Sequence, residues 1–177
     1  MTDKDFNQRK VTDDYAPEQA RIKLASFFEG HPSALEAVRR LNRTQACVLA
    51  ALLDSKSITT SGYTIPADYG VKRASAVIHS LEKVYSFPIS SRRVETESDV
   101  GNRTKQSLFF ITQEDQIRLK ADPELVFKER HDSACLKRES QAQKDIRRLF
   151  KEYGESGVLE LLKKVANDGS DIDSDAI

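Results

Sequence analysis

The chain has few of the residues and patterns on which several classes of protein depend. Its two cysteines, Cys47 and Cys135, lie in separate segments, so we expect no disulfide framework and a reducing compartment. The longest uncharged apolar run, Ala46 to Leu53, has eight residues, far fewer than the roughly 20 that a membrane helix needs. Residues 1–6 contain acids and no apolar core, unlike a secretory signal. We therefore expect a cytoplasmic protein with no membrane partner.

Signatures of catalysis and metal binding are also missing. The seven glycines are scattered, so there is no glycine-rich phosphate loop. Residues 154–157 lack the G-x-S-x-G spacing of a nucleophile elbow. His131 and Cys135 are four residues apart on an expected helix, but two further ligands for a structural zinc are absent nearby. The sequence thus predicts a protein that is not an enzyme and that uses neither a metal nor another cofactor.

Charge is informative only when it is counted by segment, because the 28 basic residues equal the 28 acidic residues. Residues 71–111 contain seven basic and four acidic side chains, which leaves a local charge of +3. A basic segment within a neutral chain is typical of a nucleic-acid-binding surface. Residues 167–177 contain four aspartates and no basic residue, and we expect them to form a disordered acidic tail.

Apolar residues at helical spacing predict a series of helices before residue 85. The expected helices span residues 17–29, 33–41, 42–53, 60–69 and 71–84, with a short extended segment at Ile58-Thr59. Ser33–Glu36 and Asn42–Gln45 are capping patterns, and Gly70 suits a left-handed helix cap. Cys47 is expected to be a small core residue. Residues 1–15 are polar and aperiodic, and they predict a flexible arm.

After residue 88 the period changes from helical to extended. Ile89–Glu95 and Thr104–Thr112 predict two strands, joined by a flexible polar loop over 96–103. Three helices followed by a two-stranded ribbon is the element order of a winged helix-turn-helix. The expected fold is therefore mainly α with a small two-stranded β wing, in a winged helix-turn-helix domain with N-terminal helices that spans residues 16–112.

Residues 113–166 predict a C-terminal helical extension. Lys128–Asp145 has few apolar residues, so it predicts a solvated helix or a linker. Two amphipathic stretches follow, one over Ile146–Tyr153 and one over Val158–Val165. They favour either a dimerisation hairpin, which would make a homodimer through residues 140–166, or a cap packed against the preceding domain. The sequence leaves both interpretations open.

The predicted helix 71–84 carries the strongest functional signal. With Ile78 turned inward, its basic and small polar side chains point outward, where the second helix of a helix-turn-helix meets the major groove of DNA. The ribbon adds basic side chains for contacts with the DNA backbone or the minor groove. The candidate DNA-binding residues are Lys72, Arg73, Ser75, Ala76, His79, Ser80, Lys83, Arg92, Arg93, Arg103 and Lys105. Ordinary solvated charge is the alternative for any one of them, and His79 either donates to DNA or hydrogen-bonds to the wing.

Short motifs between residues 41 and 94 resemble a known family. They are Leu41-Asn42 with Gln45, Ile58-Thr59, Gly70-Val71, Ile78-His79-Ser80-Leu81 and Ile89-Ser90-Ser91-Arg92-Arg93-Val94. They resemble a small winged helix-turn-helix family found mostly in bacteriophage and prophage proteins. Glu82 stands where that family usually has Arg, and Tyr85-Ser86-Phe87-Pro88 replaces its Gly-Tyr turn. The resemblance implies a phage or prophage DNA-binding protein, and it supports the fold more than any particular role. Together with the basic helix face and hairpin, it leads us to expect a phage or prophage transcriptional regulator that reads the major groove with helix 71–84 and the backbone with the 89–112 wing.

Two other hypotheses stay open. One is a phage replication or single-strand-binding accessory factor whose acidic tail binds a host or phage protein. Against it, the basic segment has few aromatic residues on which bases could stack. The other is an interaction module that binds a host protein on a winged-helix scaffold.

Overall fold

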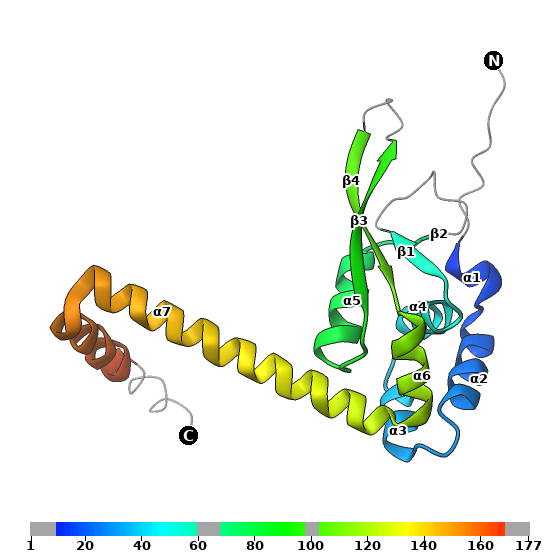
Figure 1. The fold of residues 1–177 in the computed structure, drawn as a ribbon, viewed down its shortest axis with the longest axis horizontal. Coiled ribbons are helices and arrows are strands. Elements are labelled where there is room, and N and C mark those ends of the chain that lie inside the picture. The colour runs from blue at the N-terminus through cyan, green and yellow to red at the C-terminus, as the bar shows by residue number, and fades with distance from the viewer. Residues whose placement is uncertain (1–9, 60–67, 98–102, 169–177) are drawn as a thin grey trace, which may run out of the picture. The chain divides into compact units, whose positions relative to one another are not determined.

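A computed structural model of the chain describes residues 10–59, 68–97 and 103–168, and Figure 1 shows their arrangement into helices and strands. The elements are α1 (Val11–Asp14), α2 (Pro17–Phe27), α3 (Pro32–Arg39), α4 (Arg43–Leu53), β1 (Ser57–Thr59), β2 (Asp68–Gly70), α5 (Ala74–Lys83), β3 (Ser90–Glu97), β4 (Arg103–Phe110), α6 (Gln113–Ala121) and α7 (Pro123–Asp168). The fold is thus mainly α with a small sheet. It divides into two compact units, the first ending at His131 and the second beginning at Asp132.

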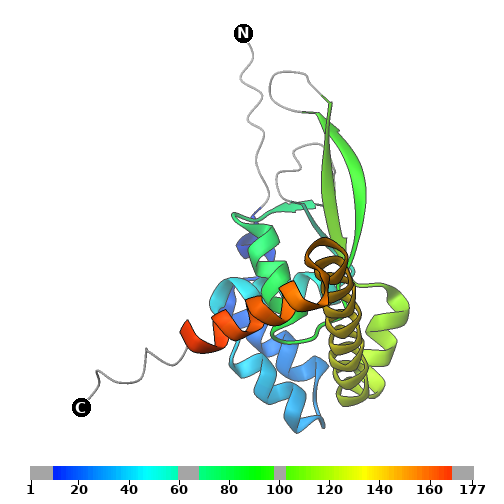
Figure 2. The same ribbon diagram turned by 90° about the vertical axis from the view of Figure 1, so that its left-hand side faces the viewer.

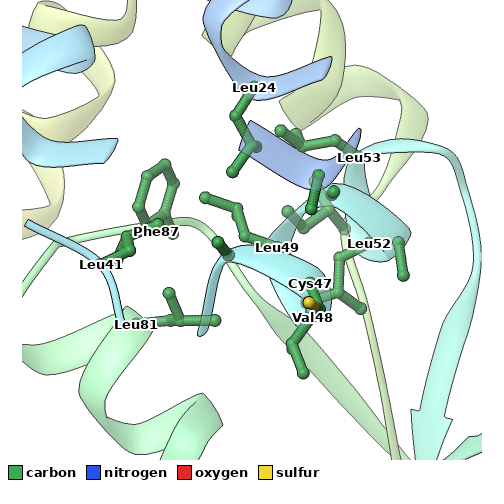
Figure 3. Close-up of a cluster of buried hydrophobic side chains, with 14 of the residues drawn as sticks. Leu24, Leu41, Cys47, Val48, Leu49, Leu52, Leu53, Leu81 and Phe87 are labelled. Carbon is green, nitrogen blue, oxygen red and sulfur yellow. The ribbon is translucent and has the colours of Figure 1, made fainter. Parts of the chain in front are cut away.

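Helix α4 is the centre of the first unit's core. Every residue from Gln45 to Leu53 is buried, and small side chains among them let neighbouring helices approach closely. Figure 3 shows Leu24 of α2, Leu81 of α5 and Phe87 around α4. Burial of each large apolar side chain stabilises the fold by about 1.5–3 kcal/mol. Cys47 is buried in this core as expected, and burial raises the pKa of its thiol.

The predicted flexible arm is wrong for residues 10–15. Val11 in α1 and Tyr15 after it are both buried. The Tyr15 hydroxyl donates a hydrogen bond to Asp54 at 3.0 Å, and its ring meets the ring of Tyr69 edge-on with centroids 5.9 Å apart. Asp54 and Tyr69 lie about 40 and 54 residues after Tyr15 in the chain. Local sequence periodicity therefore could not predict that Tyr15 is buried. Residues 1–9 lie outside the described residues.

The sheet has four strands in the order β2-β1-β4-β3. Strands β3 and β4 form the expected antiparallel hairpin, from Ser90 opposite Phe110 to Glu97 opposite Arg103. Strand β1 adds to β4 in antiparallel fashion and to β2 in parallel fashion. The predictions of the hairpin and of a short extended segment at Ile58-Thr59, which lies in β1, are therefore confirmed, and β2 was not predicted. In Figures 1 and 2 the hairpin extends past β1 and β2, because β1 pairs only with Leu108 and Phe109 of β4.

Two predicted features between α4 and β3 are wrong where the structure describes them, at residues 68–70. The expected helix over 60–69 ends instead in strand β2, where Tyr69 is fully buried; residues 60–67 lie outside the described residues. Gly70 is a strand residue rather than a left-handed cap, and directly before α5 it is Arg73 that has a left-handed conformation. The expected loop over 96–103 is shorter, since β3 continues to Glu97 and β4 begins at Arg103; residues 98–102 lie outside the described residues.

Of the two predicted helix-capping patterns, one is confirmed and the other is wrong because its residues have other hydrogen-bond partners. Asn42 and Gln45 form the expected capping box, with both reciprocal hydrogen bonds at 2.9 Å. The pattern at Ser33–Glu36 fails, because α3 begins at Pro32 with His31 before it. Proline lacks an N–H and suits the first helical position, and the Ser33 hydroxyl instead donates to Glu124.

The boundary between the units lies beyond the predicted domain end at residue 112. Thr112 caps α6 by accepting a hydrogen bond from the N–H of Asp115. Leu119 of α6 and Val126 of α7 are buried in the first unit's core, so this unit continues into α7. No helix among the described residues combines the length and the apolar content needed to cross a bilayer.

The second unit contains the remainder of α7, in two helical segments that meet at Gly154. Gly154 has φ +68° and ψ 172°, a combination that is essentially restricted to glycine. Lys128–Asp145 is a solvated helix rather than a linker. Helix α7 runs to Asp168, so the predicted tail is helical at residues 167 and 168, and residues 169–177 lie outside the described part of the chain.

Candidate nucleic-acid interface

Helix α5 has one buried face and one exposed face. Ala74, Ile78 and Leu81 are buried in the core, as the helical spacing predicts. The opposite side is exposed at four of the predicted DNA-binding residues, which are Ser75, Ala76, His79 and Lys83. These residues therefore form an outward surface of small and basic side chains on one short helix.

Lys72 and Arg73 precede α5 instead of belonging to it. The predicted helix start at Val71 is wrong, because Val71 is buried and the chain turns at Lys72 and Arg73 before α5 begins at Ala74. Arg73 adopts a left-handed conformation, φ +56° and ψ +36°, which is uncommon for a residue other than glycine. Its carbonyl accepts hydrogen bonds from the N–H groups of Ala76 and Val77. Both basic side chains remain exposed.

The starts of α4 and α5 together form an open hollow of about 510 Å³. The residues that line it are Asn42, Arg43, Thr44, Gln45, Lys72, Arg73, Ala76 and Val77. Three of these are cations and none is an acid. The two helix N-termini add partial positive charge from their free N–H groups. The hollow is therefore a positive concave surface suited to an anion such as a phosphate.

Arg43 is a candidate binding residue that the sequence reasoning missed. It is the first residue of α4 and lies about 30 positions before Lys72 and Arg73 in the chain. The capping pattern Asn42–Gln45 predicts where α4 begins and therefore that Arg43 lies at a helix N-terminus. That signal indicates anion binding only once the second helix start is known to lie beside it.

Gln45 joins α4 to α5. Its side chain is only 8% exposed, and its Oε1 accepts a hydrogen bond from the backbone N–H of Asn42. Its Nε2 donates to the hydroxyl of Ser80 on α5 at 2.8 Å. Ser80 therefore differs from its predicted role, because its hydroxyl faces a neighbouring helix and the residue is half-buried. Position 80 lies at the edge between the buried and exposed faces of α5.

The predicted basic residues of the hairpin do not form one patch. Side chains alternate between the two faces of a strand, so Arg92 and Arg93 lie on opposite faces. The Arg92 guanidinium lies over the ring of Phe110, 5.8 Å from its centroid. In the register of the hairpin, Lys105 lies directly opposite Glu95. This acidic residue reduces the positive charge of the hairpin, although Arg92, Arg93, Arg103 and Lys105 are all exposed.

His79 makes no hydrogen bond to the described strands of the hairpin, and its side chain is exposed on α5. The interpretation that it hydrogen-bonds to the wing is therefore wrong for these strands, and donation to DNA stays a prediction. Within residues 10–59, 68–97 and 103–168, no group of three or more His, Cys, Asp or Glu side chains is placed to hold a metal ion.

Comparison of this chain with protein-family models, with curated proteins and with solved structures finds no match.

Proposed function

We propose that this chain is a winged helix-turn-helix protein that binds double-stranded DNA, in keeping with the resemblance to phage and prophage DNA-binding proteins, and that it regulates transcription. The observation that carries the proposal is the hollow at the starts of α4 and α5. There Arg43, Lys72 and Arg73 surround one concave surface that has no acidic lining residue.

The dimensions of α5 suit the major groove. Its ten residues make a rod about 15 Å long and about 10–12 Å wide with its side chains, and the major groove is about 12 Å wide. Ser75 and Ala76 are small enough to let the helix backbone approach the bases closely. His79 and Lys83 follow at helical spacing on the same exposed face and would reach base edges or phosphates.

The hollow would hold the DNA backbone while α5 enters the groove. Arg43, Lys72 and Arg73 would neutralise phosphates beside the helix N-termini. The hairpin follows α5 in the chain and would add weaker contacts through Arg93, Arg103 and Lys105, since Glu95 lies among them. Its pairing with β1 supports the winged arrangement.

Titration of a labelled duplex at several salt concentrations tests the proposal. If about six phosphates are neutralised, the slope of log affinity against log salt is about −5. The triple variant Arg43→Ala, Lys72→Ala and Arg73→Ala removes three of these phosphate contacts, so the slope becomes shallower by about 3. Its affinity for the duplex at moderate salt falls by at least tenfold.

The matched control is Lys120→Ala with Lys128→Ala and Arg130→Ala, three exposed cations of the first unit. This control removes the same charge and is expected to bind DNA nearly as the unchanged chain does. Absence of duplex binding at low salt, or equal losses in both triple variants, would refute the proposal. A preference for oligo-dT over duplex would favour a single-strand-binding factor instead. Phe87 is buried and Tyr85 and Phe109 are half-buried, so few aromatic rings are available for base stacking.

A further inference from the structure

The second unit has a large apolar surface and almost no core. Between residues 146 and 165 of α7, seven large apolar side chains are exposed: Ile146, Phe150, Tyr153, Leu159, Leu161, Leu162 and Val165. Among residues 132–168, Val158 is the only apolar side chain that is buried. A segment this short gains little stability from its own burial, and exposed apolar side chains this numerous on one short segment indicate an interaction site.

We propose that this surface binds a second copy of the same chain. The proposal goes beyond DNA binding and does not depend on it. The spacing of the apolar residues and the size of the surface both favour a second copy as the partner.

The apolar residues are spaced for helix-to-helix packing. Ala142, Ile146, Leu149 and Tyr153 follow one another at intervals of four, three and four, and Val158, Leu161 and Val165 at three and four. Alternation of three and four is the pattern of a seam that packs against another helix with the same pattern. Because Gly154 separates the two runs, each copy carries two such seams. They are exposed at Ile146, Tyr153, Leu161 and Val165, while Leu149 is half-buried and Val158 is buried within the chain. A second copy offers the same seams, as a two-fold symmetric interface requires.

The area is adequate for a dimer. Seven side chains of about 150–200 Å² each, roughly half exposed, offer about 500–700 Å² per copy. A stable interface buries about 800 Å² per partner, including its polar rim. Residues 144–164 contain six basic and four acidic side chains, so two copies would meet with a net charge of only +2 each and with both signs present for pairing.

Sedimentation velocity of the full chain, over a wide range of protein concentration and without DNA, measures the assembly directly. One chain has a mass of 20.0 kDa, so the expected species is about 40 kDa, twice that value. Phe150→Glu with Leu162→Glu is expected to sediment as a single chain. These side chains are 43% and 61% exposed, so the substitutions leave the fold of one chain in place. The matched control, Ile22→Glu with Ile117→Glu, replaces two exposed apolar residues of the first unit and is expected to remain a dimer.

A second measurement needs no substitution. Isotopically heavy and light chains are mixed and treated with a lysine cross-linker, and heavy-to-light links are expected at Lys144, Lys151 and Lys163. A single chain at all concentrations would overturn the proposal. So would a dimer that survives Phe150→Glu with Leu162→Glu, an assembly larger than two copies, or heavy-to-light links confined to the first unit. Because no DNA is present, none of these results bears on the DNA-binding proposal.

Discussion

Replacement of Gln45 by alanine tests how α5 is held against α4. Gln45 connects the two helices that form the hollow, through one hydrogen bond to the backbone of Asn42 and one to Ser80. Both bonds involve side-chain atoms that alanine lacks. The side chain is buried, so water does not readily replace them.

The expected destabilisation is about 3 kcal/mol. Each lost hydrogen bond contributes about 1 kcal/mol net, and loss of the buried methylene group adds about 0.8 kcal/mol. The remaining polar groups of Asn42 and Ser80 add a smaller cost where they stay unsatisfied. For a unit of this size, 3 kcal/mol lowers Tm by roughly 10 °C.

Urea unfolding followed by circular dichroism gives the free energy of unfolding of the Gln45→Ala variant. The same measurement on Ser80→Ala and on the double variant gives the coupling between the two side chains, which we expect to be about 1 kcal/mol. Gln113→Ala, at an exposed position of α6, is the control and should change stability by less than about 0.5 kcal/mol. A Gln45→Ala loss below about 1 kcal/mol, or strict additivity with Ser80→Ala, would refute the reasoning.

Two further predictions concern pH. Burial, together with the hydrogen bond to the Asp54 carboxylate, raises the pKa of Tyr15 well above its ordinary value. Only the unfolded chain therefore ionises this phenol as the pH rises through about 10, and stability is lost above that pH. Tyr15→Phe should cost about 1 kcal/mol at neutral pH and reduce the loss in alkali, and parallel slopes against pH would contradict this account. The hydrogen bond from Ser33 lowers the pKa of the Glu124 carboxyl, with a smaller contribution from His31. The ionised Glu124 carboxylate therefore stabilises the fold above the ordinary carboxyl pKa, and this stabilisation is lost as the pH falls through the lowered pKa. Ser33→Ala should raise the pKa of Glu124 measured by carboxyl NMR, and an unchanged titration would exclude Ser33 as the cause.

Local chemistry made several elements predictable. The capping box of Asn42 and Gln45, the cap at Thr112 and the proline at position 123 act within a single helical turn. The outward face of α5 follows from its helical period, because Ile78 and Leu81 must be buried together. Alternation along β3 also separates Arg92 from Arg93 without any knowledge of the fold.

Other features depend on residues that are distant in the chain. The capping pattern at Ser33 is overridden by Pro32 and by Glu124, which lies 91 positions away. Whether Lys105 faces an acid or open solvent depends on the register of the hairpin, which places Glu95 opposite it. Tyr69 is buried in a strand instead of a helix because β1 offers it a backbone partner.

The amino-acid sequence by itself determined most of the helical segments, the starts of α2, α4, α6 and α7, and which side of α5 is exposed, since these depend on interactions within a few residues. Only the tertiary structure decided that Arg43 lies beside Lys72 and Arg73, and that Ser80 faces Gln45. The physical reason is that a concave binding surface forms between elements. Its charge is therefore the sum of side chains whose proximity depends on how α4 and α5 pack, and local spacing does not encode that distance.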